Sequence, residues 1–137
     1  SYETSILALL FNATPIANIA DNAASSPLTN LYVSLHTADP GEAGTQATNE
    51  ATYTSYARVA VARTSGGWVV SAGSVSPAAA ITFPEATGGT NTITHFGIGT
   101  ASSGAGVLLY SGTVTPSLSV STGVTPLLKT TSTITED

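Results

Sequence analysis

The spacing of apolar residues changes at Leu31, and this change constrains the fold more than any other feature of the sequence. Leu31, Val33 and Leu35 occupy every second position, and the segment from Ala57 to Ala62 repeats the pattern. Alternation of this kind is typical of half-buried β-strands, which direct one row of side chains into a core and the other toward solvent. The same reasoning predicts further short strands near residues 68–72, 80–83, 92–98, 107–112, 118–121 and 134.

No helical pattern separates these strands, so the sequence predicts an all-β protein rather than one with a parallel sheet and crossover helices. We predict an antiparallel β-sandwich or jelly roll of about eight strands with a short N-terminal helix. The length of 137 residues leaves room for one such domain. We therefore divide the chain into an N-terminal helical or extended segment, residues 1–30, and a β-sandwich domain, residues 31–137.

A helix is predicted from Ser1 to Asn12. Ser1 can cap its N-terminus, and Glu3 places a negative charge in its first turn. Pro15 cannot continue the helix, and a second short helical turn is predicted between Ile16 and Ala24. An isolated helix of this length is marginal in water, so its apolar side must be buried against the protein's own core or against a neighbouring subunit. The candidate interface residues on that side are Ile6, Leu7, Leu10 and Phe11.

The segment from Thr37 to Ser55 has no regular apolar spacing, and we call it the excursion. It contains the turn Asp39-Pro40-Gly41. Irregular segments longer than about 12 to 15 residues are uncommon in compact domains and are usually functional or disordered. We therefore predict that the excursion carries much of the contact with a partner protein, the alternative being a mobile loop that touches nothing. The candidate interface residues in and after it are Asp39, Glu42, Glu50, Tyr53, Tyr56 and Arg58.

Charged residues make up only 8% of the chain, against about 25% in an average protein. The formal net charge is −5, and the three cations Arg58, Arg63 and Lys129 cannot form the basic stripe that neutralises phosphates. No stretch approaches the length of about 18 apolar residues that a membrane span requires. We therefore expect neither nucleic acid nor a membrane as a partner. Separately, the absence of cysteine excludes disulfides and thiolate chemistry.

Residues that could support catalysis or metal binding do not form a recognisable motif. His36 and His95 could share a metal with Asp39 or Glu42, but hydrogen-bonded strand histidines explain them better. No serine lies in a Gly-x-Ser-x-Gly elbow. The glycines between residues 97 and 106 lack dinucleotide-binding spacing, and we interpret them as a strand end and a flexible hairpin. The sequence thus predicts a non-enzymatic protein without a catalytic, metal or cofactor site, and no cofactor is expected.

The run LYVSLHTADPGEAGTQATNEATYTSYARVAVAR, from Leu31 to Arg63, resembles a family of small virion proteins of tailed bacteriophages. Later segments agree with it, namely GGWVVS, AAAITFPEATGG, THFGIGTASSGAGVLLYSGTV and the ending TITED. Members of this family are often labelled tail fibre proteins, and small all-β proteins of this size are also typical of capsid decoration, or cement, proteins. The resemblance implies a structural role in a phage particle and transfers no catalytic motif.

Of the possible locations in the particle, we favour the capsid. A decoration protein would bind the assembled shell of the major capsid protein and stabilise it by mass action and multivalency. The alternative is a tail fibre or tail adaptor component involved in host attachment, with tail proteins as partners. A fibre shaft ordinarily needs a repetitive or coiled-coil region, which the sequence lacks. We expect a homo-oligomer, made in the cytoplasm of the bacterial host and located on the capsid exterior of the virion.

Overall fold

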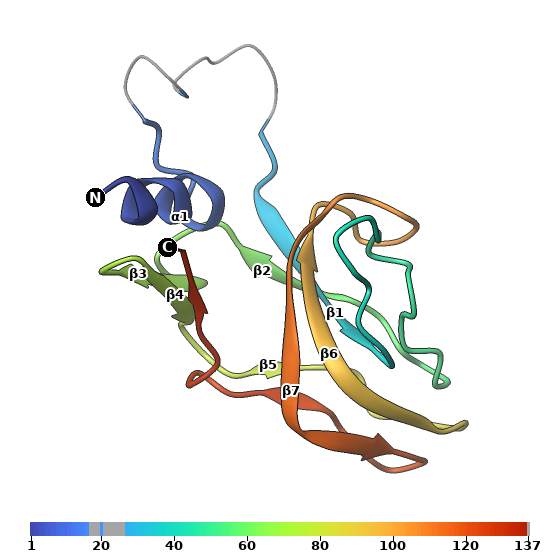
Figure 1. The fold of residues 1–137 in the computed structure, drawn as a ribbon. Helices are drawn as coiled ribbons and strands as arrows, with labels where there is room; N and C mark the ends of the chain where they lie inside the picture. The colour runs from blue at the N-terminus through green and yellow to red at the C-terminus, as the bar shows by residue number, and fades with distance from the viewer. Residues whose placement is uncertain (17–19, 21–26, 137) are drawn as a thin grey trace. The chain divides into compact units, whose positions relative to one another are not determined.

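Figure 1 shows the fold in a computed structural model, which describes residues 1–16, 20 and 27–136. These residues contain one helix and nine strands. Their bounds are α1 Tyr2–Asn12, β1 Asn30–His36, β2 Val59–Ala62, β3 Trp68–Ser71, β4 Ser74–Pro77, β5 Ile81–Thr82, β6 Asn91–Gly99, β7 Leu108–Val120, β8 Leu127–Leu128 and β9 Ile134–Thr135.

The chain forms two compact units, which we describe separately. The first, which we call the helical unit, comprises Ser1–Asn30, Val61–Ile81 and Leu128–Asp137. The second, which we call the sheet unit, comprises Leu31–Ala60 and Thr82–Leu127. β5 and β8, where the chain passes from one unit to the other, form a two-stranded sheet.

The sheet unit is built on a four-stranded sheet in the order β2-β1-β6-β7. β1 pairs antiparallel with β6, and β6 pairs antiparallel with β7. Leu31, Val33 and Leu35 of β1 are all buried, as their alternation predicts. Ser34 and His36 of the other row are buried as well, so β1 is not the half-buried strand that the alternation predicted, because the excursion covers its second face. This sheet is the frame from which the excursion leaves at the end of β1.

β7 lies at one edge of that sheet. Pro116 lies at an irregularity of β7, between Thr113, which pairs with His95, and Leu118, which pairs with Ile93. Proline is tolerated there because it cannot donate to a ladder and is confined to edge strands and bulges. The strands predicted near residues 107–112 and 118–121 are both parts of β7. The two predicted segments correspond to the two paired stretches of β7, which continue as one strand through the irregularity at residues 114–117.

The helical unit packs α1 against the antiparallel sheet β3-β4-β9. Leu7 and Phe11 of α1 are completely buried. The Phe11 ring meets the ring of Trp68 edge to face, with their centroids 4.8 Å apart and an interplanar angle of 72°. Edge-to-face packing is a favourable arrangement for aromatic rings, and Trp68 is the largest of the fully buried side chains.

Polar contacts define both ends of α1. Ser1 caps the N-terminus, since its hydroxyl accepts a hydrogen bond from the backbone N–H of Thr4 at 3.3 Å. At the other end, the Arg63 guanidinium donates to the carbonyl oxygens of Leu10 at 2.7 Å and Leu9 at 2.8 Å, and to that of Leu28 at 2.6 Å. Arg63 therefore satisfies carbonyl groups that the end of a helix leaves without partners.

The predicted fold class is confirmed: the protein is mostly β, its sheets are antiparallel, and one short helix lies at the N-terminus. β4 and β8 were not predicted. The two units divide the chain differently from the expected segments 1–30 and 31–137, because residues 61–81 and 128–137 join the N-terminal segment. Long-range packing of α1 on β3 and β4 produces this grouping, and local residue patterns carry no signal for it.

Two further expectations concern particular segments. Of the helical turn predicted between Ile16 and Ala24, only Ile16 and Ala20 belong to the described residues, and the remainder lies outside them. Within the described part of the chain, no helix has both the length and the apolar character needed to cross a membrane.

Candidate functional site

The excursion leaves β1 and contains no helix or strand, as predicted, but it is fastened to the sheet unit by buried polar side chains. Glu50, near its end, forms the first of these contacts with Arg58, which follows the excursion. The Arg58 guanidinium donates to both carboxylate oxygens of Glu50, with Nε–Oε2 at 2.6 Å and Nη2–Oε1 at 2.9 Å. The side chain of Arg58 is 2% exposed and that of Glu50 is 21% exposed. This two-point geometry is the strong form of an arginine–carboxylate pair.

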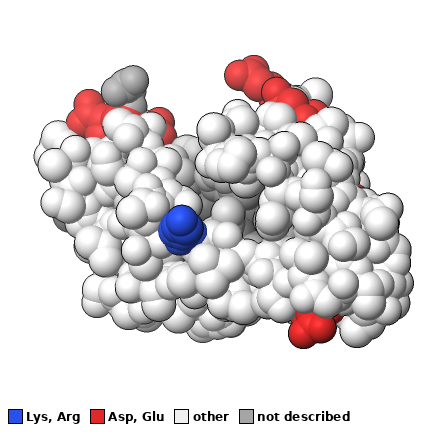
Figure 2. Space-filling view, turned by 90° about the horizontal axis from the view of Figure 1, so that it is seen from below, with Lys and Arg blue, Asp and Glu red and all other residues white. Residues whose placement is uncertain are grey.

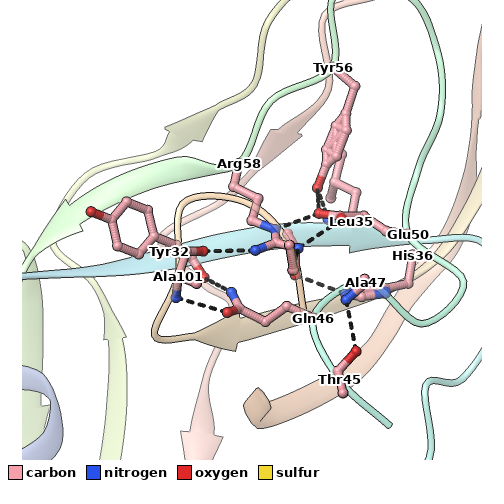
Figure 3. Close-up of polar contacts among 12 residues, drawn as sticks. Tyr32, Leu35, His36, Thr45, Gln46, Ala47, Glu50, Tyr56, Arg58 and Ala101 are labelled. Atoms are coloured by element: carbon pink, nitrogen blue, oxygen red, sulfur yellow. Dashed lines mark hydrogen bonds and ion pairs between the residues drawn. The ribbon is translucent and has the colours of Figure 1, made fainter. Parts of the chain in front are cut away.

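Tyr56 completes a cluster with this ion pair, shown in Figure 3. Its hydroxyl donates to Glu50 Oε2 at 2.8 Å and accepts from the backbone N–H of Leu35 at 3.1 Å. Burial raises the pKa of Tyr56, so the phenol stays protonated and remains a donor to Glu50. The hydrogen bond to Glu50 also raises the pKa of Arg58. Glu50, Tyr56 and Arg58 thus form one hydrogen-bonded cluster, which we call the Glu50 cluster.

The same arginine also reaches the loop that joins β6 to β7. Its guanidinium donates to the carbonyl oxygen of Ala101 at 2.8 Å and to that of Gly104 at 2.6 Å. Arg58 therefore links the end of the excursion to the β6–β7 loop. Its donors are used within the sheet unit.

Gln46 anchors the middle of the excursion to the same loop. Its side chain is completely buried, and its Oε1 accepts from the backbone N–H of Ala101 at 2.9 Å. Its own backbone N–H donates to the carbonyl oxygen of Ala105 at 2.9 Å. A Cβ atom on either Gly99 or Gly106 would lie 2.1 Å from the Gln46 side chain, so both positions require glycine.

His36, the last residue of β1, provides a further anchor. It is completely buried; its Nδ1 lies 2.8 Å from the carbonyl oxygen of Thr48, and its Nε2 lies 2.8 Å from the hydroxyl of Ser34. A carbonyl oxygen can only accept, so Nδ1 carries the proton and Nε2 accepts from Ser34. A Cβ atom on Gly97 would lie 2.8 Å from both His36 Nε2 and the Ser34 hydroxyl oxygen.

Burial lowers the pKa of His36 and outweighs the opposing effects of the Thr48 carbonyl and the Glu50 carboxylate. Both ring nitrogens of His36 face protein atoms rather than a metal. His95 lies beside Thr94, with Nδ1 at 2.8 Å from the threonine hydroxyl. Among residues 1–16, 20 and 27–136, no group of three or more metal-binding side chains comes together.

Tyr53, near the end of the excursion, and Tyr56, just after it, pack inward. Tyr53 is 3% exposed, and its hydroxyl donates to the carbonyl oxygen of Pro84 at 2.9 Å. Its ring lies 5.4 Å from that of Tyr56, centroid to centroid. Side chains around Tyr53, Tyr56 and Arg58 line a small open hollow of about 320 Å³ together with residues 102–104.

The structure thus divides the predicted interface residues of the sheet unit into two groups. Glu50, Tyr53, Tyr56 and Arg58 come together but make contacts within the unit. Asp39 and Glu42, at the tip of the excursion, are exposed and line a separate groove with residues 108–111 of β7. In the helical unit, Leu7 and Phe11 are completely buried, whereas Ile6 and Leu10 are partly exposed.

The sequence reasoning missed Gln46, and it did not assign His36 and Ser34 to buried anchoring. A signal for them existed in the glycines at 97, 99 and 106, which we interpreted as part of a flexible hairpin. Glycines placed opposite polar residues of a neighbouring segment leave room for buried side chains. The arrangement can hold the excursion in one conformation and present its tip. The titratable side chains of the Glu50 cluster and of His36 are all engaged in structural contacts.

Comparison with known proteins adds one match. The sequence model of a family described as Podophage GP4 fiber I protein gp80 matches residues 9–135. The match therefore spans nearly the whole chain, including residues of both units. A search of curated proteins found no match.

Proposed function

The chain belongs to the family of the podophage GP4 fiber I protein gp80, and from this premise we propose that it is a structural subunit of a fibre of the phage particle. Family membership makes it a virion structural protein. The match supports the fibre assignment by the family's own description and by its span of residues 9–135. It does not single out the capsid, which the sequence analysis favoured.

The proposed role requires binding and no catalysis. The side chains best suited to proton transfer in the sheet unit have structural partners: Glu50 is paired with Arg58, and both nitrogens of His36 are engaged. We propose that the partners are other virion proteins, namely tail proteins, and that copies of the chain associate in the particle. Neither nucleic acid nor a membrane is part of this proposal, in keeping with the scarcity of cations.

Capsid decoration is the second candidate. It is favoured by a specific observation: the sequence has neither heptads nor the internal repeat that a fibre shaft ordinarily needs. In this role the chain would bind the assembled shell of the major capsid protein and stabilise it by mass action. Its many identical contacts would add through multivalency.

The position and copy number of the chain in purified particles test both candidates. A fibre subunit is present in few copies, and particle reconstruction or antibody labelling should detect it at the tail. A decoration protein is present in many copies distributed over the shell. Absence of the chain from purified infectious particles would contradict both roles.

A further inference from the structure

The tip of the excursion and the start of β7 line an open groove of about 500 Å³ in the sheet unit. Asp39, Gly41 and Glu42 form one side, and residues 108–111 form the other. The side chains of Asp39 and Glu42 are exposed, whereas those of Leu108 and Leu109 are partly buried. The groove therefore combines two carboxylates with an apolar strip.

Hydrogen bonds hold this tip in place. Asp39 Oδ1 accepts from the backbone N–H of Gly41 at 2.9 Å, and the Asn49 amide donates to the Asp39 carbonyl oxygen at 3.3 Å. The backbone N–H of Thr37 donates to the Asn49 carbonyl oxygen at 2.8 Å, and that of Gly44 to the Gly41 carbonyl oxygen at 3.1 Å. The two carboxylates are thus presented on a preorganised turn, which lowers the entropic cost of binding.

The residues that line this groove include two carboxylates and no lysine or arginine. Arg58 is paired with Glu50, and Arg63 binds carbonyl groups at the end of α1. Both arginines are therefore engaged away from this groove. On the face drawn in Figure 2, acidic side chains appear at several separate places and basic side chains at one. Asp39 and Glu42 thus offer negative charge to an outside cation.

We propose that this groove binds an extended, basic segment of another virion protein, an inference that rests on the proposed function. β7 ends its sheet, so an extended segment can lie along its outer edge, as in strand addition. Pro116 restricts such pairing to the first half of β7. A Lys or Arg of the segment would pair with Asp39 and Glu42 while its aliphatic stem covers Leu108 and Leu109.

Charge removal at the tip tests this inference. Particles assembled without the protein are mixed with wild-type chain or with the variant D39N/E42Q, and bound protein is measured at rising salt. Asn at position 39 keeps the oxygen that accepts from Gly41, so the turn is preserved. The variant should bind about tenfold more weakly, and its binding should depend less on salt. The matched control E85Q, which removes an exposed carboxylate elsewhere in the sheet unit, should bind like wild type.

The outcomes separate this inference from the proposed function. Wild-type chain that fails to bind any particle contradicts the proposed function itself. Equal binding of wild type and D39N/E42Q overturns the groove assignment and leaves the virion role intact. Carbodiimide cross-linking in particles then identifies the occupant. A link from Asp39 or Glu42 to a lysine of another virion protein supports the inference, whereas a link to Lys129 of a second copy overturns it.

Discussion

In the helical unit, α1 is held by apolar packing of Leu7, Phe11 and Trp68, whereas in the sheet unit the excursion is held by buried polar side chains. The two arginines also differ in the acceptors that they bind. Arg63 donates to carbonyl oxygens at the end of a helix, and Arg58 pairs with a carboxylate. The comparison shows that both arginines of this low-charge chain satisfy acceptors inside their own unit, one at the end of a helix and one at the end of an irregular segment.

Phe11→Ala tests the apolar side of the comparison and should have the largest effect. Removing a fully buried ring that packs against Trp68 should lower the free energy of unfolding by about 3–5 kcal/mol, from lost burial and the cavity left behind. Urea denaturation measures the change. The control Tyr2→Ala, at a residue that is 72% exposed, should change it by less than about 0.5 kcal/mol. An equally small effect of Phe11→Ala would show that the packing of Phe11 against Trp68 does not stabilise α1.

Arg58→Ala tests the polar side. It leaves the partly buried Glu50 carboxylate and the carbonyls of Ala101 and Gly104 without their donor, so the loss should be about 3 kcal/mol. Arg63→Ala should cost less, about 1–2 kcal/mol, because it removes hydrogen bonds to neutral carbonyls and strands no carboxylate. Equal losses for the two variants would show that the Glu50 cluster adds nothing beyond ordinary hydrogen bonds.

Gly99→Ala tests whether the excursion requires space for Gln46. The added Cβ would lie 2.1 Å from the Gln46 side chain, so the variant should lose about 1–3 kcal/mol of unfolding free energy. Gln46→Ala removes the clashing atoms, and in the double variant the two effects should be strongly non-additive. Additive losses in this double-mutant cycle would mean that Gly99 is needed for another reason.

The buried histidine predicts a pH dependence confined to the sheet unit. Burial lowers the pKa of His36 in the folded protein, so the unfolded chain takes up a proton first as the pH falls. The free energy of unfolding should therefore decrease below about pH 6.5, the ordinary pKa of histidine, and level off below the folded-state pKa. His36→Asn should remove this slope while His95 is retained. A slope that persists in the variant would assign it to other groups.

The smallest effect is expected at the tip of the excursion. Asp39→Asn with Glu42→Gln removes two exposed charges without removing the hydrogen bond to Gly41, so stability should change by less than about 0.5 kcal/mol. Thermal denaturation measures this directly. A large loss of unfolding free energy would show that Asp39 and Glu42 stabilise the fold. The excursion could then not be divided into anchoring residues and exposed residues that are free to bind a partner.

Much of the fold follows from local patterns. The alternation of Leu31, Val33 and Leu35 predicted β1, and the capping serine with its following apolar residues predicted α1. These predictions succeed because hydrogen bonding within a strand or helix repeats at a fixed period that the side chains follow. The excursion was recognised by the absence of any period.

The candidate site could be predicted only in part. Arg58 and Glu50 were both predicted as interface residues. In the structure they pair with each other within the sheet unit. They stand eight positions apart in irregular chain, so their pairing depends on how the excursion closes rather than on a local repeat.

Composition and local residue patterns specify an antiparallel β-protein with a short capped helix and few charges, and the motifs of the chain resemble those of a phage virion family. Long-range contacts are needed to pack residues 61–81 with α1, to place Gln46 in the space left by Gly99 and Gly106, and to leave Asp39 and Glu42 exposed. Strand and helix patterns arise from neighbours in the chain. Burial and the pairing of charges arise from contacts between distant segments, which form only when the chain closes on itself.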